Sequence, residues 1–419
     1  MGRHLWFAAI ATVAGALAGC GDGVGPDGFD DDKLRQQFAL VPLGPVPQPP
    51  DGPASAERIE LGRLLFFDPI LSGEKDVSCG TCHHPAFAFG DGRQFSAGAS
   101  GVGLGPARAV SNSAISGQAI GLTPRNSPTV LNAGYNADSL GHLSHAGLQF
   151  WDGRAIGLEE QARGPITSRT EMAGDAYTPE VARDSVVARL REIEAYVQRF
   201  RAGFPVEATS LPRSDVISMD TYGKALAAYQ RELVTRNAAF DRYAAGDDGA
   251  LTGQQKQGLE LFFTTARCGE CHSGPMFSDY SFRVIGVPQA GSGGAVLSGD
   301  DVGREEHTGR LEDRHAFRTP SLRNVELTAP YMHDGVFATL EEVVRFYDAG
   351  ASPRHADIAA SALDTLVATP IGMSDAQVAA VVAFLKALTD PGIGLAPQLR
   401  TVPSSVPSGL TPVFGVRAP

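Results

Sequence analysis

The chain carries two copies of one short motif, Cys79-Gly-Thr-Cys82-His83 and Cys268-Gly-Glu-Cys271-His272. A C-x-x-C-H run is the sequence mark of covalent haem attachment. The two thiols form thioethers with the haem vinyl groups, and the histidine becomes the proximal iron ligand. The two copies therefore predict two c-type haems, with His83 and His272 as their proximal ligands.

A zinc site is the alternative interpretation, because paired cysteines often form half of a zinc site or a redox pair. The two pairs could together offer four thiolates to one zinc ion. A histidine follows each pair directly, however, and the redox compartment expected for the chain argues against free thiols. Both observations favour haem attachment.

The N-terminus predicts export. Arg3 and His4 precede an apolar run over 5–18 that is too short to span a bilayer. The run ends in Leu-Ala-Gly-Cys20, which is typical of a bacterial lipoprotein signal with Cys20 as the lipidated residue. An ordinary signal peptide that ends near a cysteine is the alternative. Of the five cysteines, Cys20 alone lies outside the haem motifs, so no pair remains for a disulfide. We expect a periplasmic or cell-envelope protein that meets the membrane only through its lipid anchor.

The length of 419 residues suits two domains. A net charge of −12 argues against a nucleic-acid partner. The proline-rich stretch 41–53 predicts an extended tether, and no membrane-spanning helix is expected after the signal. The expected division is a signal peptide over 1–19, a tether over 20–54, an N-terminal domain over 55–205, a C-terminal domain over 206–392 and a tail over 393–419.

A faint internal repeat supports two related domains. A stretch that ends in Leu-Phe-Phe precedes each haem motif, at 62–67 and at 258–263, and Pro, Phe and Asp follow each motif. Capping-box pairs predict helices over 253–265, 340–348 and 375–389, and apolar spacing predicts helical structure over 181–200. Residues 95–125 are rich in Gly, Ala and Ser and predict a long surface loop. The expected fold is all-α, with two cytochrome c-like domains and long loops.

A family resemblance rests on four motifs in fixed order over roughly 55–390. The chain resembles the bacterial diheme cytochrome c peroxidases and their relatives, the tryptophan-modifying diheme enzymes of methylamine utilisation (MauG). The motifs are LGRLLFFDPILS before the first haem run, RNSPTVLNA at 125–133, QFWDGRA at 149–155 and TPSLRNVELTAPYMHDG at 319–335.

The resemblance implies roles for three residues around the first haem. Trp151 matches a tryptophan that lies between the two haems and supports electron transfer; the alternative is an ordinary core aromatic. Gln161 and Glu171 match a distal glutamine and glutamate. Heterolytic cleavage of peroxide requires a proton to move from the inner oxygen to the departing one, which a carboxylate near the iron can do. An amide can orient the peroxide by hydrogen bonding.

One departure from the family concerns the first haem. In typical diheme peroxidases a loop after the first haem supplies a second histidine that caps the iron until the enzyme is reduced. Here no histidine occurs between His84 and His142, and His142 and His145 fall in an insertion just before Trp151. We therefore expect the haem held by His83 to be open without reductive activation.

A second departure concerns the sixth ligand of the second haem. Peroxidases carry Met at that position, but alignment of TLEEVVRFYD on the family pattern places Tyr347 there, as in the methylamine-utilisation branch. A half-buried helix aromatic is the alternative for Tyr347. Met332 is the rival ligand, and His333 is expected to be a turn or supporting residue. Thioether ligation favours reduced iron, whereas a phenolate should favour ferric and higher states.

The resemblance also implies a calcium ion between the haems. Asn126, Thr328 and Pro330 match the family's calcium ligands, the last two through backbone carbonyls. Oxygen donors suit Ca²⁺.

Three functions follow as hypotheses. The first is reduction of hydrogen peroxide with electrons from a small donor protein, a cytochrome c or a cupredoxin. The second is a MauG-like enzyme that uses a high-valent state of both haems to oxidise a partner protein. The absence of that enzyme's surface tryptophan before Cys268 counts against it. The third is a plain diheme electron carrier, against which Glu171 speaks. A homodimer is left open.

Overall fold

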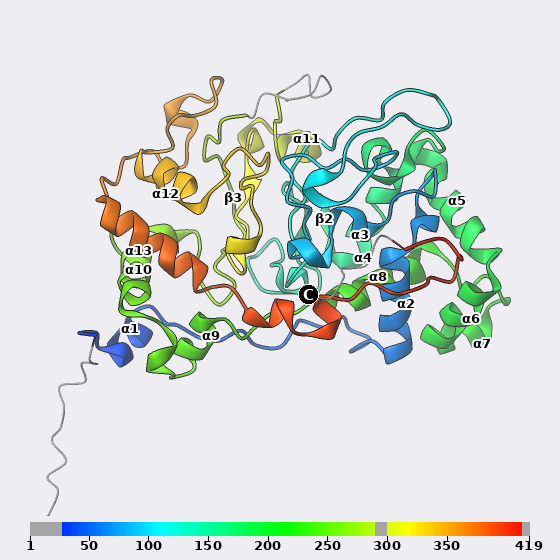
Figure 1. Cartoon of the computed structure of the whole chain (residues 1–419), viewed down its shortest axis with the longest axis horizontal. Helices are drawn as coiled ribbons and strands as arrows, with labels where there is room; N and C mark the ends of the chain where they lie inside the picture. The colour runs from blue at the N-terminus through cyan, green and yellow to red at the C-terminus, as the bar shows by residue number, and fades with distance from the viewer. Residues whose placement is uncertain (1–26, 290–299, 413–419) are drawn as a thin grey trace, which may run out of the picture.

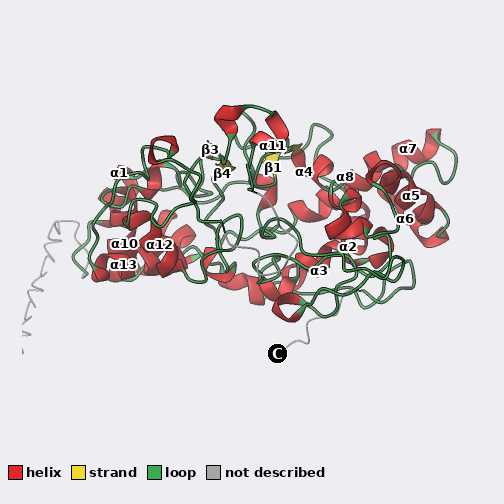
Figure 2. Cartoon of the chain, turned by 90° about the horizontal axis from the view of Figure 1, so that it is seen from above, coloured by secondary structure: helices red, strands yellow, loops and turns green. Residues whose placement is uncertain are grey.

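The computed structural model describes residues 27–289 and 300–412. The expected signal peptide and Cys20 lie outside these residues. Within them the chain is helical, and the strands form only two short antiparallel pairs. The expected all-α class is confirmed in this respect. Figure 1 shows two helical lobes side by side, with long loops between them that Figure 2 shows from above.

The first lobe is built around the core that contains Leu65, Phe66, Phe200 and Tyr229. Its main elements are α2 (Ala56–Phe67), α3 (Cys79–Cys82), β1 (Leu148–Gln149), β2 (Ala155–Ile156), α4 (Gly157–Gln161), α5 (Pro179–Arg191), α6 (Glu194–Gly203), α7 (Pro205–Ser210) and α8 (Met219–Arg231).

The second lobe is built around the core in which the rings of Phe240, Phe262, Phe277 and Phe384 meet edge to face. Its main elements are α1 (Asp31–Gln37), α9 (Ala239–Ala244), α10 (Gly253–Phe263), β3 (Phe282–Arg283), α11 (Glu305–Thr308), β4 (Phe317–Arg318), α12 (Leu340–Asp348) and α13 (Asp375–Lys386).

The predicted helix starts are confirmed by their caps. Thr252, Thr339 and Ser374 each accept the backbone N–H three residues on, at the start of α10, α12 and α13. The predicted ends of α10 and α13 are two or three residues too late. The helical stretch predicted over 181–200 is two helices, α5 and α6, because the backbone of Ile193 is extended between them.

In each lobe the entry helix crosses another helix closely at a glycine. Gly62 of α2 lies against the backbone carbonyl of Ala225 in α8, and Gly258 of α10 lies against that of Ala380 in α13. A Cβ at either glycine would overlap the carbonyl oxygen. The Leu-Phe-Phe helices of the sequence repeat are therefore the entry helices of two similarly built lobes.

Replacement of Gly258 by alanine is expected to lower the free energy of unfolding by ~1–3 kcal/mol, because α10 and α13 must move apart. Gly253→Ala in the same helix is the matched control. A Cβ there meets only the Asp27 side chain at 3.5 Å, an ordinary contact. Urea unfolding of the holoprotein measures both variants. Equal stability of the two variants would contradict the assigned crossing.

The two lobes meet at Thr235. The side-chain amides of Asn132 and Asn324 both donate to the Thr235 hydroxyl, at 2.7 and 2.8 Å. Both asparagines have left-handed backbone, with φ of 59° and 60°. The same residue type, conformation and partner recur in both lobes, so the repeat extends well beyond the haem motifs.

The expected boundary between 205 and 206 does not coincide with the division of the two cores. Helix α8 packs against α2, and Tyr222, Leu226 and Leu233 belong to the first core. The second core takes up the chain again at Phe240. The predicted boundary falls before α8, the last helix of the first lobe. Local sequence patterns could not place α8 there, because its packing partner α2 lies far earlier in the sequence.

The expected tether and tail are also partly wrong. Leu34 and Leu40 are buried in the second core, and Phe38 stacks on Phe263 with ring centroids 5.0 Å apart. Ile393 and Leu399 of the expected tail are buried in the first core. Figure 1 shows the chain crossing from the second lobe to the first after α1, and again after α13. Residues 31–40 and 393–399 therefore belong to the folded body.

The segment 95–125 is only partly a surface loop. Arg108 is 6% exposed and donates to the carbonyls of Ala97, Gly98 and Gly103 at 2.5–2.9 Å. A Cβ on Gly98 would overlap the backbone of Glu171. This segment therefore packs directly beneath the backbone that carries Glu171.

Candidate functional site

The two haem motifs adopt the same local geometry. The backbone N–H of His83 donates to the Cys79 carbonyl at 3.0 Å, and that of His272 donates to the Cys268 carbonyl at 2.8 Å. Each motif therefore makes one helical turn. The glycine of each motif, Gly80 or Gly269, lies against the ring of the last residue of the entry helix, Phe67 or Phe263.

Both proximal histidines are oriented by a backbone carbonyl. Nδ1 of His83 lies 3.2 Å from the Phe89 carbonyl, and Nδ1 of His272 lies 2.9 Å from the Phe277 carbonyl. Since a carbonyl only accepts, Nδ1 carries the proton and the lone pair of Nε2 remains for a metal. Burial lowers the pKa of both imidazoles, which favours the neutral form that binds iron. Both motifs fit haem c.

A large cavity lies beside the first motif. Its volume is about 1260 Å³. It is lined by Cys79, Cys82, His83, Trp151, Gln161 and Glu171 from the first lobe and by His307, Arg318 and His333 from the second. The first-lobe residues that were expected to hold and serve the peroxidatic haem are thus brought together around one space. His142 and His145 do not line it.

Trp151 lies where the lobes meet. Its indole N–H donates to the Asn126 carbonyl at 3.0 Å, and its own carbonyl accepts the backbone N–H of Arg318 at 2.8 Å. The hydrogen bond from Arg318 joins the first lobe to β4 of the second lobe. The ring is therefore held at the interface, as a bridging role requires.

Glu171 is half-buried and lies near the first haem motif. It belongs to the single π-turn Arg169–Ala173. Burial raises the pKa of its carboxyl group, and the Arg154 guanidinium and a Ser168 hydrogen bond oppose that shift. The Glu171 charge in turn helps to raise the pKa of the Cys79 and Cys82 thiols, which places it close to both attachment points.

Gln161 ends α4, ten residues before Glu171 in the sequence, and lines the same cavity. Helix α4 packs against α8, and Arg231 of α8 fixes α4 through a two-pronged ion pair with Glu159 at 2.7 and 3.0 Å. The amide is therefore mounted on a rigid element.

Tyr347 lies close to the second motif. Burial raises the pKa of its phenol above the ordinary range, and the sulfurs of Cys268 and Cys271 contribute to the shift. Met332 packs in the same small apolar cluster as Tyr347. Tyr347 and Met332 therefore both remain candidates for the sixth ligand of the second haem. Because burial raises its pKa, the Tyr347 side chain is a neutral phenol unless a cation such as iron binds its hydroxyl oxygen.

His333 was expected to be a turn or supporting residue, and the structure makes it the counterpart of Trp151. Its carbonyl accepts the backbone N–H of Asn126 at 2.7 Å, which mirrors the bond from Arg318 to Trp151. The imidazole stacks on Phe317 with ring centroids 3.7 Å apart, and burial lowers its pKa to about 4. A neutral, 5% exposed imidazole therefore faces the cavity from the second lobe.

Two of the residues matched to calcium ligands, Asn126 and Pro330, lie beside the same stretch of backbone. Asn126 donates through Nδ2 to the Arg93 carbonyl at 2.8 Å, which leaves its side-chain oxygen as the acceptor for other groups. Gly335 packs against both Gln94 and Pro330, so the turn that contains Pro330 lies beside the same backbone. This donor set is compatible with an oxygen-seeking cation.

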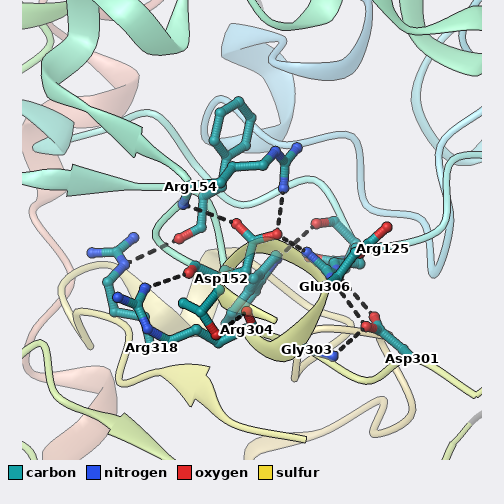
Figure 3. Close-up of polar contacts among 12 residues, drawn as sticks. Arg125, Asp152, Arg154, Asp301, Gly303, Arg304, Glu306 and Arg318 are labelled. Carbon is teal, nitrogen blue, oxygen red and sulfur yellow. Dashed lines mark hydrogen bonds and ion pairs between the residues drawn. The ribbon is translucent and has the colours of Figure 1, made fainter. Parts of the chain in front are cut away.

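An ion-pair network that the sequence did not reveal joins the lobes, as Figure 3 shows. Arg125 binds Asp152 at 2.6 Å within its own lobe and Asp301 at 2.7 Å in the other. Arg154 adds a second cation on Asp152 at 2.8 Å, and Arg304 donates to the Asp152 carbonyl at 2.8 Å. Loss of one partner would leave a buried charge, which typically costs ~3–5 kcal/mol. Arg125 and Asp301 are too far apart in sequence for any local pattern to link them.

Comparisons with known proteins identify the relatives of the chain. Residues 56–249 match the family described as di-haem cytochrome c peroxidase. The methylamine utilization protein MauG of Methylorubrum extorquens is 36% identical over 395 residues, which cover 93% of this chain and 94% of that protein. The chain belongs to the di-haem cytochrome c peroxidase family.

Other relatives support the same family assignment. The cytochrome c551 peroxidase of Pseudomonas aeruginosa is 37% identical, with 75% of this chain and 79% of that protein covered. A crystal structure of a MauG-like protein associated with microbial copper homeostasis superposes with a TM-score of 0.66 at 30% identity, over 85% of this chain and 96% of that one. The resemblance drawn from the motifs is confirmed. As a di-haem cytochrome c peroxidase, the chain is an oxidoreductase for which this family implies two haem c groups.

Proposed function

We propose that this protein reduces hydrogen peroxide in the cavity beside His83, with electrons that enter from an external donor through the second haem. The observation that carries this proposal is the convergence of His83, Trp151, Gln161 and Glu171 on one cavity. The family supports the same activity. A haem bound through Cys79, Cys82 and His83 would supply the site for peroxide and the transfer of electrons to it.

The side chains around the cavity would have separate roles in proton transfer, peroxide orientation and electron transfer. Glu171 would take the proton from the inner oxygen of peroxide and return it to the departing oxygen, a role that the raised pKa of its carboxyl group supports. The amide of Gln161 orients the peroxide by hydrogen bonding. Trp151 links the two halves of the protein along the electron path, held there by its bonds to Asn126 and Arg318.

Steady-state turnover tests the proposal. The ferric holoprotein is mixed with hydrogen peroxide and a reduced small cytochrome c or cupredoxin, and oxidation of the donor is followed. We expect catalytic oxidation of many donor equivalents per protein. Failure to oxidise either donor, together with a long-lived two-electron-oxidised state, would contradict the proposal in favour of the second candidate.

The second candidate is a MauG-like oxidation of a partner protein, and the position of Tyr347 beside Cys268 and Cys271 favours it. A hard anionic ligand at the second haem would help that haem to share oxidising equivalents. Thr264 to Arg267 stand where the MauG branch has its surface tryptophan, so a partner would need another exit for the oxidising equivalent. A plain electron carrier would not need the carboxylate of Glu171.

We also propose a calcium ion held by the side-chain oxygen of Asn126 and the carbonyls of Thr328 and Pro330. Removal of calcium with EGTA is expected to destabilise the holoprotein by roughly 3 kcal/mol relative to a solution at a hundred times Kd. Thermal unfolding with and without added Ca²⁺ measures the effect, with Mg²⁺ as the control ion. An Asn126→Ala variant that keeps the full calcium response would contradict this site.

We further propose a periplasmic or cell-envelope location with a lipid anchor at Cys20. Within residues 27–289 and 300–412, no helix is long and apolar enough to cross a membrane. The signal-like N-terminus and the cysteine that ends it support the anchor.

A further inference from the structure

A cluster of two histidines and one aspartate lies in the second lobe, apart from the haem motifs. Nε2 of His315 is 2.8 Å from the Asp300 carboxylate, and Nε2 of His355 is 3.5 Å from it. Ligand atoms of all three residues lie within 4.8 Å of one another. The two imidazole side chains are only 8% and 10% exposed.

The spacing of the three groups is compatible with one shared metal ion. His315 and Asp300 are at hydrogen-bonding distance, but 3.5 Å is beyond the usual length for His355 and Asp300. Two ligands of one tetrahedral zinc ion, each about 2.0–2.1 Å from the metal, are about 3.3 Å apart. One ion between the three groups would therefore satisfy both imidazoles with small movements.

We propose that Asp300, His315 and His355 form a binding site for a divalent transition metal such as Zn²⁺ or Cu²⁺. Two imidazoles and one carboxylate suit these ions and do not suit Ca²⁺, which prefers an all-oxygen shell. A fourth position is left for water or an incoming group. This proposal does not rest on the proposed peroxide chemistry.

The surroundings of the cluster allow the ion to enter. Arg314 pairs with Asp300 at 2.7 Å, but it is half-exposed and also pairs with Glu305 at 3.0 Å, so it can release the carboxylate and keep a partner. Nδ1 of His355 accepts the backbone N–H of Asp357 at 3.1 Å. Asp357 is exposed, so this N–H can turn to water when the His355 proton moves to Nδ1 and frees Nε2 for the metal.

The cluster also adjoins the cavity between the lobes. Asp300 lines that cavity, and both His315 and His355 contribute to the lowered pKa of His333. A metal ion at the cluster would thus place a positive charge near the interface that Trp151 and His333 share. Its effect would reach the haems by electrostatics and not by direct contact.

Zinc uptake by the haem-loaded protein tests the proposal. The protein is stripped with a chelator and then dialysed against micromolar Zn²⁺ and excess Ca²⁺, and bound zinc is measured by mass spectrometry against iron. We expect one zinc ion per chain. His315→Gln and His355→Gln are each expected to weaken zinc binding at least about tenfold, whereas His142→Ala, which removes an exposed histidine outside the cluster, should bind as the wild type does.

Haem content and thermal midpoint establish that each variant is folded before zinc is compared. Because the two glutamine variants lie in different loops, a folding defect in one leaves the other as a test. Asp300→Asn gives a third variant with the same side-chain shape. Wild-type protein that takes up no more zinc than the double variant His315→Gln/His355→Gln would overturn the proposal, and the cluster would then be a hydrogen-bonded group only.

Discussion

Replacement of Glu171 by glutamine is expected to lower the rate of reaction with hydrogen peroxide by roughly 10²–10⁴-fold, the usual worth of a positioned acid-base group. The substitution keeps the size and hydrogen-bonding capacity of the side chain but removes its ability to carry a proton. Stopped-flow absorption of the ferric holoprotein after mixing with peroxide measures the rate. Haem content and the resting spectrum should stay as in the wild type.

The pH dependence adds a second signature of Glu171. Burial raises its pKa, so the ionised form that can accept a proton is lost at a higher pH than for an ordinary carboxyl group. As pH falls through this raised pKa, the wild-type rate should fall. The Glu171→Gln variant should lack this acid limb.

The matched control for Glu171 is Glu180→Gln, which changes an exposed carboxylate at the start of α5. Its rate and pH profile should equal those of the wild type. If the rate of Glu171→Gln lies within threefold of the control rate, Glu171 is not the acid-base group for peroxide cleavage.

Replacement of Tyr347 by methionine is expected to change the low-spin spectrum of the second haem and to raise its reduction potential. A thioether favours the reduced iron, whereas a phenolate favours the ferric state. Axial ligands tune haem potentials over a range of about 0.8 V, so a shift on the order of 0.1 V or more is expected. Spectroelectrochemical titration of the holoprotein measures it.

Met332→Leu is the matched control for Tyr347, because both side chains pack in the same apolar cluster. If Tyr347 is the ligand, Met332→Leu keeps the wild-type spectrum and potential. The opposite pattern, with a changed spectrum in Met332→Leu and none in Tyr347→Met, would make Met332 the ligand and remove the main support for the MauG-like alternative.

Local patterns predicted the parts of this protein that depend on neighbours in sequence. The haem motifs, the capping boxes at Thr252, Thr339 and Ser374, and the paired entry helices all rest on residues within a few positions of one another. The roles proposed for Gln161 and Glu171 came from the family motifs, and the structure places both side chains at one cavity.

Long-range contacts account for what the sequence could not predict. The first lobe extends to Leu233 because α8 packs against α2, across more than a hundred intervening residues. The bond from Arg125 to Asp301 and the shared partner of Asn132 and Asn324 likewise depend on how the lobes meet. Composition marked 95–125 as a loop, but only the packing of Gly98 against Glu171 reveals its place beneath the site.

The two haems are expected to be unequal, with an open iron on His83 and a closed iron on His272. Electron paramagnetic resonance of the oxidised holoprotein distinguishes these two states of the iron. We predict one high-spin and one low-spin ferric signal before any reduction, with the high-spin signal lost on addition of stoichiometric peroxide. Two low-spin signals, with a second histidine on the His83 haem, would contradict the account.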